Sequence, residues 1–288
     1  MNPIIEGYYA DPEIRLYGDE YWLFATTSCQ RPQQTYFDAF HSPDLKHWTK
    51  EKAVLDIANV AWAERELWAP TQFTWHDKYY IVSAANDIKN DDEVGGLGLA
   101  VADQPQGPYR DALGHPLIGN FINGAQPIDP HVYIEDDHVN LYYGGWGHCN
   151  LVQFNDDLTG FKPMADGAIF REVTPKGYVE APCMIKKDGT YYFMWSEGVW
   201  SMAGYQVVYA KAQSLEGPFI PEAVILKGDD RVAEAPGHHC VVQDRQTGDW
   251  WIIYHRRALG EKDGSNRVLC MDRLEFDADG NILPVKMS

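Results

Sequence analysis

Three acidic side chains recur at matching places in this sequence and could perform acid/base chemistry together. Asp11 and Asp129 each precede a proline, and Glu180 begins the tripeptide Glu180-Ala181-Pro182. Splitting a glycosidic bond needs one protonated carboxyl group, one ionised carboxylate to activate water, and a way to keep their pKa values apart. A third carboxylate provides this by like-charge repulsion. Two alternatives stay open, because an Asp before Pro often forms a turn and three carboxylates can hold Ca²⁺.

The three carboxylates belong to a unit that recurs five times along the chain. Each unit has a proline near a small or acidic residue, an alternating strand, a polar turn and a second, aromatic-rich strand. The prolines stand at positions 12, 70, 130, 182 and 236. This spacing predicts an all-β, five-bladed β-propeller with four antiparallel strands per blade. Residues 1–288 are expected to form this single domain, and the first strand of each blade would bring the carboxylates to one end of a central channel.

Composition excludes several classes of function. With 24 Lys and Arg against 42 Asp and Glu, the net charge of −18 disfavours nucleic acid and membrane surfaces as partners. The five cysteines lack metal-ligand spacing, so we expect free thiols. Neither a Gly-x-Ser-x-Gly elbow nor a His-Glu-x-x-His motif occurs, which excludes those serine hydrolase and zinc protease classes. No secretory signal opens the sequence, so a cytoplasmic location is expected unless a signal was removed.

The order of three motifs gives the sequence a family resemblance. Tyr9-Ala10-Asp11-Pro12, Ile128-Asp129-Pro130 and Val179-Glu180-Ala181-Pro182 together resemble glycoside hydrolase family 43, the five-bladed propeller hydrolases of arabinose- and xylose-containing polysaccharides. The resemblance covers the whole chain. It implies that Asp11 is the general base, Glu180 the general acid, and Asp129 the residue that raises the pKa of the acid and orients it. It also implies inversion of configuration, for which the two catalytic carboxyls should lie roughly 6.5–9.5 Å apart.

The resemblance also assigns residues that bind the sugar. Trp68, in the second unit, would form an aromatic wall for the terminal sugar ring, although an ordinary core tryptophan is the alternative. Arg267 would donate hydrogen bonds to sugar hydroxyls near the carboxylates. Arg256 or Arg257 could take that place instead.

The opening of the fifth unit suggests a cation in the channel. His238, in Pro236-Gly237-His238-His239, matches a Gly-His motif whose imidazole reaches the channel, near Ca²⁺ or another cation held largely by water. No cofactor is expected for the chemistry itself. His239 should point the other way and be structural. Segments 27–40 and 86–98 are expected to form the pocket rim, with Phe37 among the residues that bind substrate.

These implications lead to one preferred function and several alternatives. We expect an exo-acting, inverting α-L-arabinofuranosidase, whose partner is an arabinose- or xylose-containing oligosaccharide. A β-xylosidase, or a galactofuranosidase or galactosidase, would use the same scaffold. A non-catalytic carbohydrate-binding propeller would share the fold without needing an acid and a base. A structural propeller would carry WD or Kelch repeats, which the sequence lacks.

Overall fold

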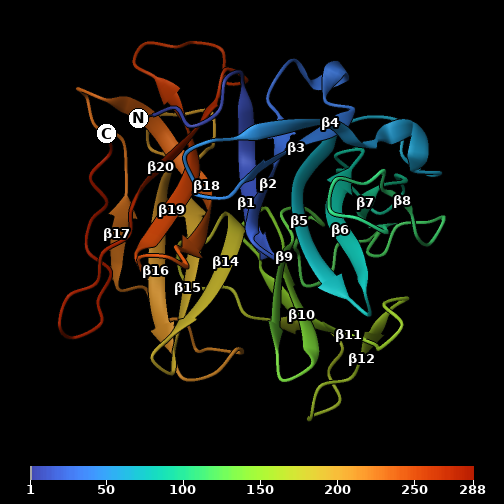
Figure 1. Cartoon of the computed structure of the whole chain (residues 1–288). Coiled ribbons are helices and arrows are strands. Elements are labelled where there is room, and N and C mark those ends of the chain that lie inside the picture. The colour runs from blue at the N-terminus through green and yellow to red at the C-terminus, as the bar shows by residue number, and fades with distance from the viewer. Residues whose placement is uncertain (1) are drawn as a thin grey trace.

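A computed structural model describes residues 2–288 as five antiparallel sheets, each of which forms one blade of a propeller (Figure 1). Blades 1 and 2 contain β1 (Tyr9–Tyr17), β2 (Glu20–Thr27), β3 (Tyr36–Ser42), β4 (Thr49–Asp56), β5 (Leu67–Trp75), β6 (Lys78–Ala85), β7 (Gly96–Ala102) and β8 (Arg110–Asp111). Blade 3 contains β9 (His131–Glu135), β10 (His138–Tyr143), β11 (Asn150–Phe154), β12 (Phe161–Lys162) and β13 (Arg171–Glu172). Blades 4 and 5 contain β14 (Glu180–Lys187), β15 (Thr190–Glu197), β16 (Gln206–Ala212), β17 (Ala223–Leu226), β18 (Ala233–Gln243), β19 (Trp250–Ala258) and β20 (Val268–Arg273).

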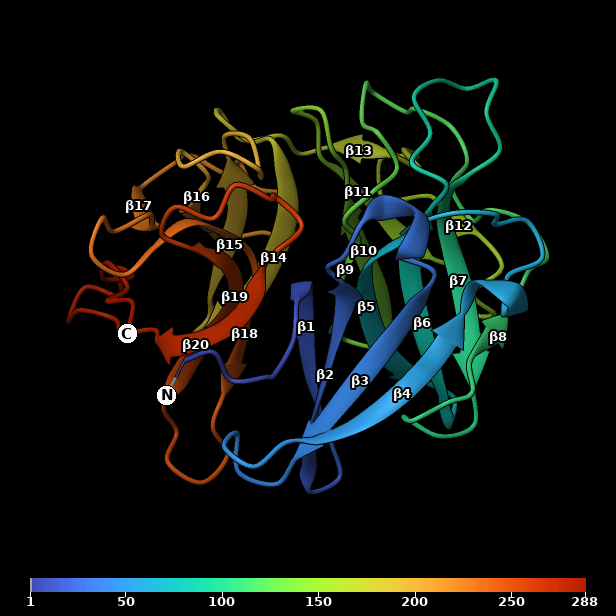
Figure 2. The same cartoon turned by 90° about the horizontal axis from the view of Figure 1, so that it is seen from above.

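The first strands of the blades form the inner ring of the molecule. β1 contacts β5, β5 contacts β9, β9 contacts β14, β14 contacts β18, and β18 returns to β1. The outer strands follow in order within each sheet, and Figure 2 shows the blades from above. The predicted five-bladed β-propeller is therefore confirmed.

Two-residue turns connect the first and second strands of blades 1 to 4, as the polar turn residues predicted, whereas residues 244–249 form the longer connection in blade 5. Loops Asp136-Asp137 and Asp188-Gly189 join β9 to β10 and β14 to β15, and all four residues have positive φ. Two consecutive positive φ angles define the type I′ turn, whose twist matches that of the flanking strands. The short polar loops thus set the register in which alternate side chains face neighbouring blades.

The hydrophobic core consists of five clusters, each between two adjacent blades. Each sheet is therefore apolar on both faces, which accounts for the many aromatic side chains in its second strand. Phe37 belongs to the cluster between blades 1 and 2 and is fully buried. Its predicted place on the pocket rim is wrong, because β3 begins at Tyr36 and strand alternation turns Phe37 toward blade 2.

The residue before each repeated proline has an unusual backbone conformation. These five residues have φ between 48° and 61°: Asp11, Ala69, Asp129, Ala181 and Ala235. In β1, β5, β14 and β18 the pairing register shifts at this point. Left-handed φ is costly for residues other than glycine, and such strain gathers at functional sites. The recurring prolines therefore mark a bulge near the start of four inner strands, and in blade 3 Pro130 directly precedes the inner strand.

The N-terminal residues close the ring at blade 5. Ile4 N donates to Leu269 O at 2.9 Å, on the edge of β20 that faces away from β19. The Asn2 side chain pairs with the backbone of Met271, accepting from its N at 2.8 Å and donating to its O at 3.2 Å. Residues 2–5 therefore cover the outer edge of the three-stranded blade 5. Within residues 2–288 no helix is long and apolar enough to cross a membrane.

This closure can be tested by substitution of Ile5, which is 5% exposed and packs in the cluster between blades 5 and 1. Ile5→Ala should lower the free energy of unfolding by about 2 kcal/mol or more, because it leaves a cavity in a packed interface. Ile134→Ala is the control, since Ile134 is 40% exposed, and should change the value by less than about 0.5 kcal/mol. Equal effects in urea denaturation would contradict the closure described here.

Candidate active site

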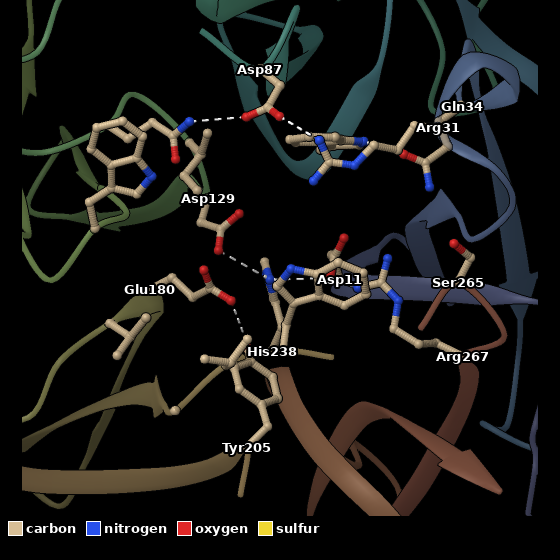
Figure 3. A pocket seen from close by; sticks show the side chains of 18 of the residues that line it. Asp11, Arg31, Gln34, Asp87, Asp129, Glu180, Tyr205, His238, Ser265 and Arg267 are labelled. Carbon is tan, nitrogen blue, oxygen red and sulfur yellow. Dashed lines mark hydrogen bonds and ion pairs between the residues drawn. The ribbon is translucent and has the colours of Figure 1, made fainter. Parts of the chain in front are cut away.

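The structure brings the three predicted carboxylates together in one pocket at the end of the channel where the inner strands begin (Figure 3). The pocket has a volume of about 300 Å³. The sequence suggested that the three carboxylates share one repeat position, but they do not. Asp11 and Asp129 directly precede their prolines, whereas Glu180 stands one residue earlier, at the position that Trp68 occupies in blade 2. The left-handed residue before each proline, with a bulge in four of the five blades, lets two adjacent positions reach the same cavity.

Asp11 is surrounded by donors. Its Oδ1 lies 3.2 Å from Arg267 Nη1, 3.2 Å from His255 Nδ1 and 3.4 Å from His238 Nδ1. Burial by itself would raise the pKa of Asp11, but the charges of Arg267 and His238 and the hydrogen bond from His255 hold that pKa well below its usual range. Asp11 is therefore an ionised carboxylate at neutral pH, as a base must be.

Glu180 and Asp129 have the opposite character. Burial, together with the negative charge of Asp11, raises the pKa of Glu180 to about 7, against a hydrogen bond from Tyr205 that lowers it. Burial and the charges of Glu180 and Asp11 raise the pKa of Asp129 well above its usual value. Two buried carboxyls that repel each other retain a proton at neutral pH. The site therefore holds an ionised group and a protonated group at the same pH.

A stacked pair of rings links the two kinds of carboxyl. Tyr205 donates from its hydroxyl to Glu180 Oε1 at 2.9 Å, and its ring stacks on His255 at a centroid distance of 5.8 Å and an interplanar angle of 6°. His255 in turn contacts Asp11. Gly237 fits against this pair, because a Cβ there would lie 2.1 Å from Tyr205 Cε1. Both rings are fully buried, so they fix the positions of Glu180 and Asp11.

Three tryptophans, each with a cation over its ring, line the pocket. Arg31 lies 5.0 Å from the ring of Trp68, and Arg267 lies 4.9 Å from the ring of Trp200. Lys89 lies 6.0 Å from the ring of Trp146. Flat apolar rings beside hydrogen-bonding groups suit the C–H face and the hydroxyls of a sugar.

Several predicted binding residues do lie at this pocket. Trp68, His238 and Arg267 line it, while Arg256 hydrogen-bonds Tyr254 and the C-terminal Ser288 instead. Arg257 is also buried away from the pocket, 3.9 Å from Glu234. Segments 27–40 and 86–98 contribute Arg31, Gln34, Asp87 and Lys89 to the lining. His239 is buried outside the pocket lining, as expected, and neither of its ring nitrogens has a hydrogen-bond partner in the protein.

The residues around His238 do not form a protein-ligated metal site. Among residues 2–288 the structure groups no three His, Cys, Asp or Glu side chains that could hold a metal ion. The Nδ1 of His238 faces the oxygens of Asp11 and Asp129, at 3.4 Å from each. A lone imidazole differs from the oxygen-rich ligand set that Ca²⁺ prefers. A cation held through water near His238 stays a prediction, and no step below depends on it.

The sequence did not identify several lining residues. Tyr205, Trp200 and Trp146 lie in loops or at strand ends outside the repeated motif, so no periodic signal marked them. His255 lies within β19, directly before the Arg256-Arg257 pair. A single histidine in a strand does not by itself indicate a functional role. Their roles emerge only when the blades are placed around the axis.

Comparisons with known proteins place this geometry among carbohydrate-active enzymes. The model of "Glycosyl hydrolases family 43" matches residues 1–282. A β-D-galactofuranosidase of Aspergillus niger is 41% identical over 100% of this chain and 85% of its own length. A β-xylosidase of Xylanibacter ruminicola is 28% identical over 80% of this chain and 77% of its own. An α-L-arabinofuranosidase structure from Clostridium thermocellum has a TM-score of 0.79 at 25% identity, covering 97% of this chain and 94% of that one.

The hydrogen bond from Tyr205 to Glu180 has a measurable consequence. Because this bond stabilises the ionised form, Tyr205→Phe should raise the pKa of Glu180 above its value of about 7 in the unaltered protein. Carboxyl ¹³C NMR titration checks this, with Tyr8→Phe as a control because Tyr8 is half exposed and outside the pocket. An unchanged or lower midpoint for Glu180 would show that the bond does not act on the acid.

Proposed function

This chain belongs to glycosyl hydrolase family 43, and on that premise we propose that it is an exo-acting, inverting hydrolase of terminal furanosyl residues. The observation that carries the proposal is that one pocket is lined both by Asp11, whose Oδ1 lies 3.2 Å from the Arg267 guanidinium, and by Glu180, whose pKa is raised to about 7. The substrate would be a non-reducing terminal sugar of an oligosaccharide. The pocket, about 300 Å³ in volume, suits a single terminal ring.

The chemistry would follow from the charges of the three carboxyls. Asp11 accepts a proton from a water molecule, and the oxygen of that water attacks the anomeric carbon. Glu180 donates its proton to the glycosidic oxygen as the bond to the leaving group breaks. We assign Asp129 the role of assisting the acid, because the charge of Glu180 raises the pKa of Asp129 and the two carboxyls therefore resist ionising together. Arg267 prevents protonation of Asp11 and has further N–H groups for sugar hydroxyls.

Two terminal sugars fit this proposal because their rings have the same configuration. α-L-Arabinofuranose and β-D-galactofuranose share the stereochemistry of ring carbons C2, C3 and C4 and differ in the exocyclic group on C4. The relative at 41% identity is a β-D-galactofuranosidase, and a structural neighbour at 25% identity is an α-L-arabinofuranosidase. We therefore place both furanosides before the β-xyloside, whose six-membered ring has a different shape.

A panel of aryl glycosides tests the sugar. Aryl α-L-arabinofuranoside and β-D-galactofuranoside should each give a kcat/KM at least about 10-fold above that of the β-D-xyloside, because hydroxyls of the wrong ring leave polar groups of the pocket unpaired. ¹H NMR of the fresh reaction should show first the anomer opposite to that of the substrate. A retained anomer would contradict the inverting mechanism, and preference for the xyloside would contradict the furanosidase.

Leaving-group ability separates the acid from the base. Glu180→Gln should lower kcat/KM by about 10²–10⁴-fold on an oligosaccharide, yet much less on a 2,4-dinitrophenyl glycoside, whose leaving group needs no proton. Asp11→Asn should lower both rates, because water activation is needed in each case. Asp188→Asn, in an exposed turn far from the pocket, should change neither rate. The reverse pattern would exchange the two roles, and wild-type rates in Asp11→Asn would remove it from the mechanism.

A further inference from the structure

A fourth buried carboxylate lines the pocket and has no part in the acid/base chemistry. The side chain of Asp87 is only 7% exposed, and its oxygens accept from Arg31 Nη1 at 2.7 Å, Lys89 Nζ at 2.6 Å and Gln126 Nε2 at 3.0 Å. A desolvated carboxylate persists only when such partners compensate it. We call these four residues, Arg31, Asp87, Lys89 and Gln126, the Asp87 cluster.

Asp87 lies in a strained turn of the backbone that the side chain of Asn86 stabilises. Asn86 and Asp87 have φ of 69° and 41°, two successive left-handed residues directly after β6. The Asn86 side chain keeps this turn, because its Oδ1 accepts from Glu64 N at 2.9 Å and from Arg65 N at 3.0 Å, while its Nδ2 donates to Val94 O at 2.9 Å. A costly backbone conformation that several hydrogen bonds maintain suggests that the strained residue has a function.

The two cations of the cluster keep donors available. The side chains of Arg31 and Lys89 are 50% and 51% exposed, and each is attached to Asp87 by a single short contact. An ammonium has three N–H donors and a guanidinium five, so most remain unused. The cluster therefore combines a buried acceptor with exposed donors in the pocket wall. Neighbouring hydroxyl groups, which both donate and accept, match that combination.

The Asp87 cluster also lies on the side of the pocket opposite the proposed acid. Figure 3 shows Asp87 and Arg31 across the cavity from Glu180 and Tyr205. The anomeric carbon must lie between Glu180 and Asp11 for reaction, so the substituent on C4 of the ring extends away from these groups. Arg31 also covers Trp68, whose indole N–H donates to Gln34 at 2.5 Å. The cluster is thus tied to an aromatic wall of the pocket.

We propose that the Asp87 cluster binds the exocyclic side chain of the terminal furanose and favours the two-carbon diol of β-D-galactofuranose over the hydroxymethyl group of α-L-arabinofuranose. The inference rests on the furanosidase function proposed above. The extra hydroxyl accepts from Lys89 or Arg31, and the hydroxyl next to it donates to Asp87. Because the two sugars have identical rings, only contacts to this side chain can separate them.

The test compares two rates in the same variant. Lys89→Met removes the donor and leaves Asp87 compensated by Arg31 and Gln126, while Asp87→Asn removes the acceptor charge. Each should lower kcat/KM for aryl β-D-galactofuranoside about 10-fold or more beyond any fall for the α-L-arabinofuranoside. The arabinofuranoside rate also reports whether the variant is folded. Lys89→Arg should restore most of the preference, and Lys52→Met, an exposed lysine on β4, should leave both rates unchanged.

The outcomes separate this inference from the proposed function. A wild-type enzyme that hydrolyses neither furanoside overturns the proposed function and this inference with it. If the wild type hydrolyses both but Lys89→Met and Asp87→Asn lower both rates equally, the cluster contacts the leaving group or supports the wall, and the inference alone fails. Unchanged rates in both variants overturn it as well.

Discussion

The desolvation of three carboxyl groups in one small cavity is the constraint on which this site depends. Asp11, Asp129 and Glu180 repel one another when ionised, and burial adds to that cost. The protein stabilises the charge on Asp11 alone, with one guanidinium and two imidazoles, and leaves the other two carboxyls to keep a proton. The proposed division between base and acid thus results from which carboxyl has cationic and hydrogen-bond donors, since Asp11 and Asp129 are equally buried and yet have pKa shifts of opposite direction.

The propeller tolerates this arrangement because the destabilising groups of the site lie apart from the apolar packing that stabilises the fold. Each inter-blade cluster is apolar, and the three carboxyl groups of the site lie apart from these clusters, at the end where the inner strands begin. The strained residue before each proline belongs to the same end, including Asp11 and Asp129 themselves. A rigid stack of sheets on either side of each inner strand can hold such conformations, which an isolated loop could not.

The sequence predicted the fold and the three carboxylates because both leave a repeated signal. Prolines at regular intervals indicated the blades, and acidic residues beside them indicated the site. Phe37 was wrongly assigned to the pocket rim. One aromatic residue in a polar segment has no pattern that distinguishes a loop at the pocket rim from the start of a buried strand. Asp87 and Tyr205 were not identified, since each occurs once, outside the repeat, and becomes significant only through neighbours from other blades. Periodicity therefore reveals the scaffold, whereas pocket residues in its irregular segments are found only in the folded structure.

The closure of blade 5 by residues 2–5 has a consequence for how the chain reaches its native state. Asn2 and Ile4 meet partners near residue 270, so nearly the entire polypeptide separates the two halves of this contact. Such a contact has a high sequence separation, and topologies rich in them fold slowly. During synthesis the first four blades can assemble in order as they leave the ribosome, while the edge of blade 5 does not yet exist. Completion of the ring is therefore a late event, and until then the apolar faces that blades 1 and 5 bury against each other remain exposed to solvent.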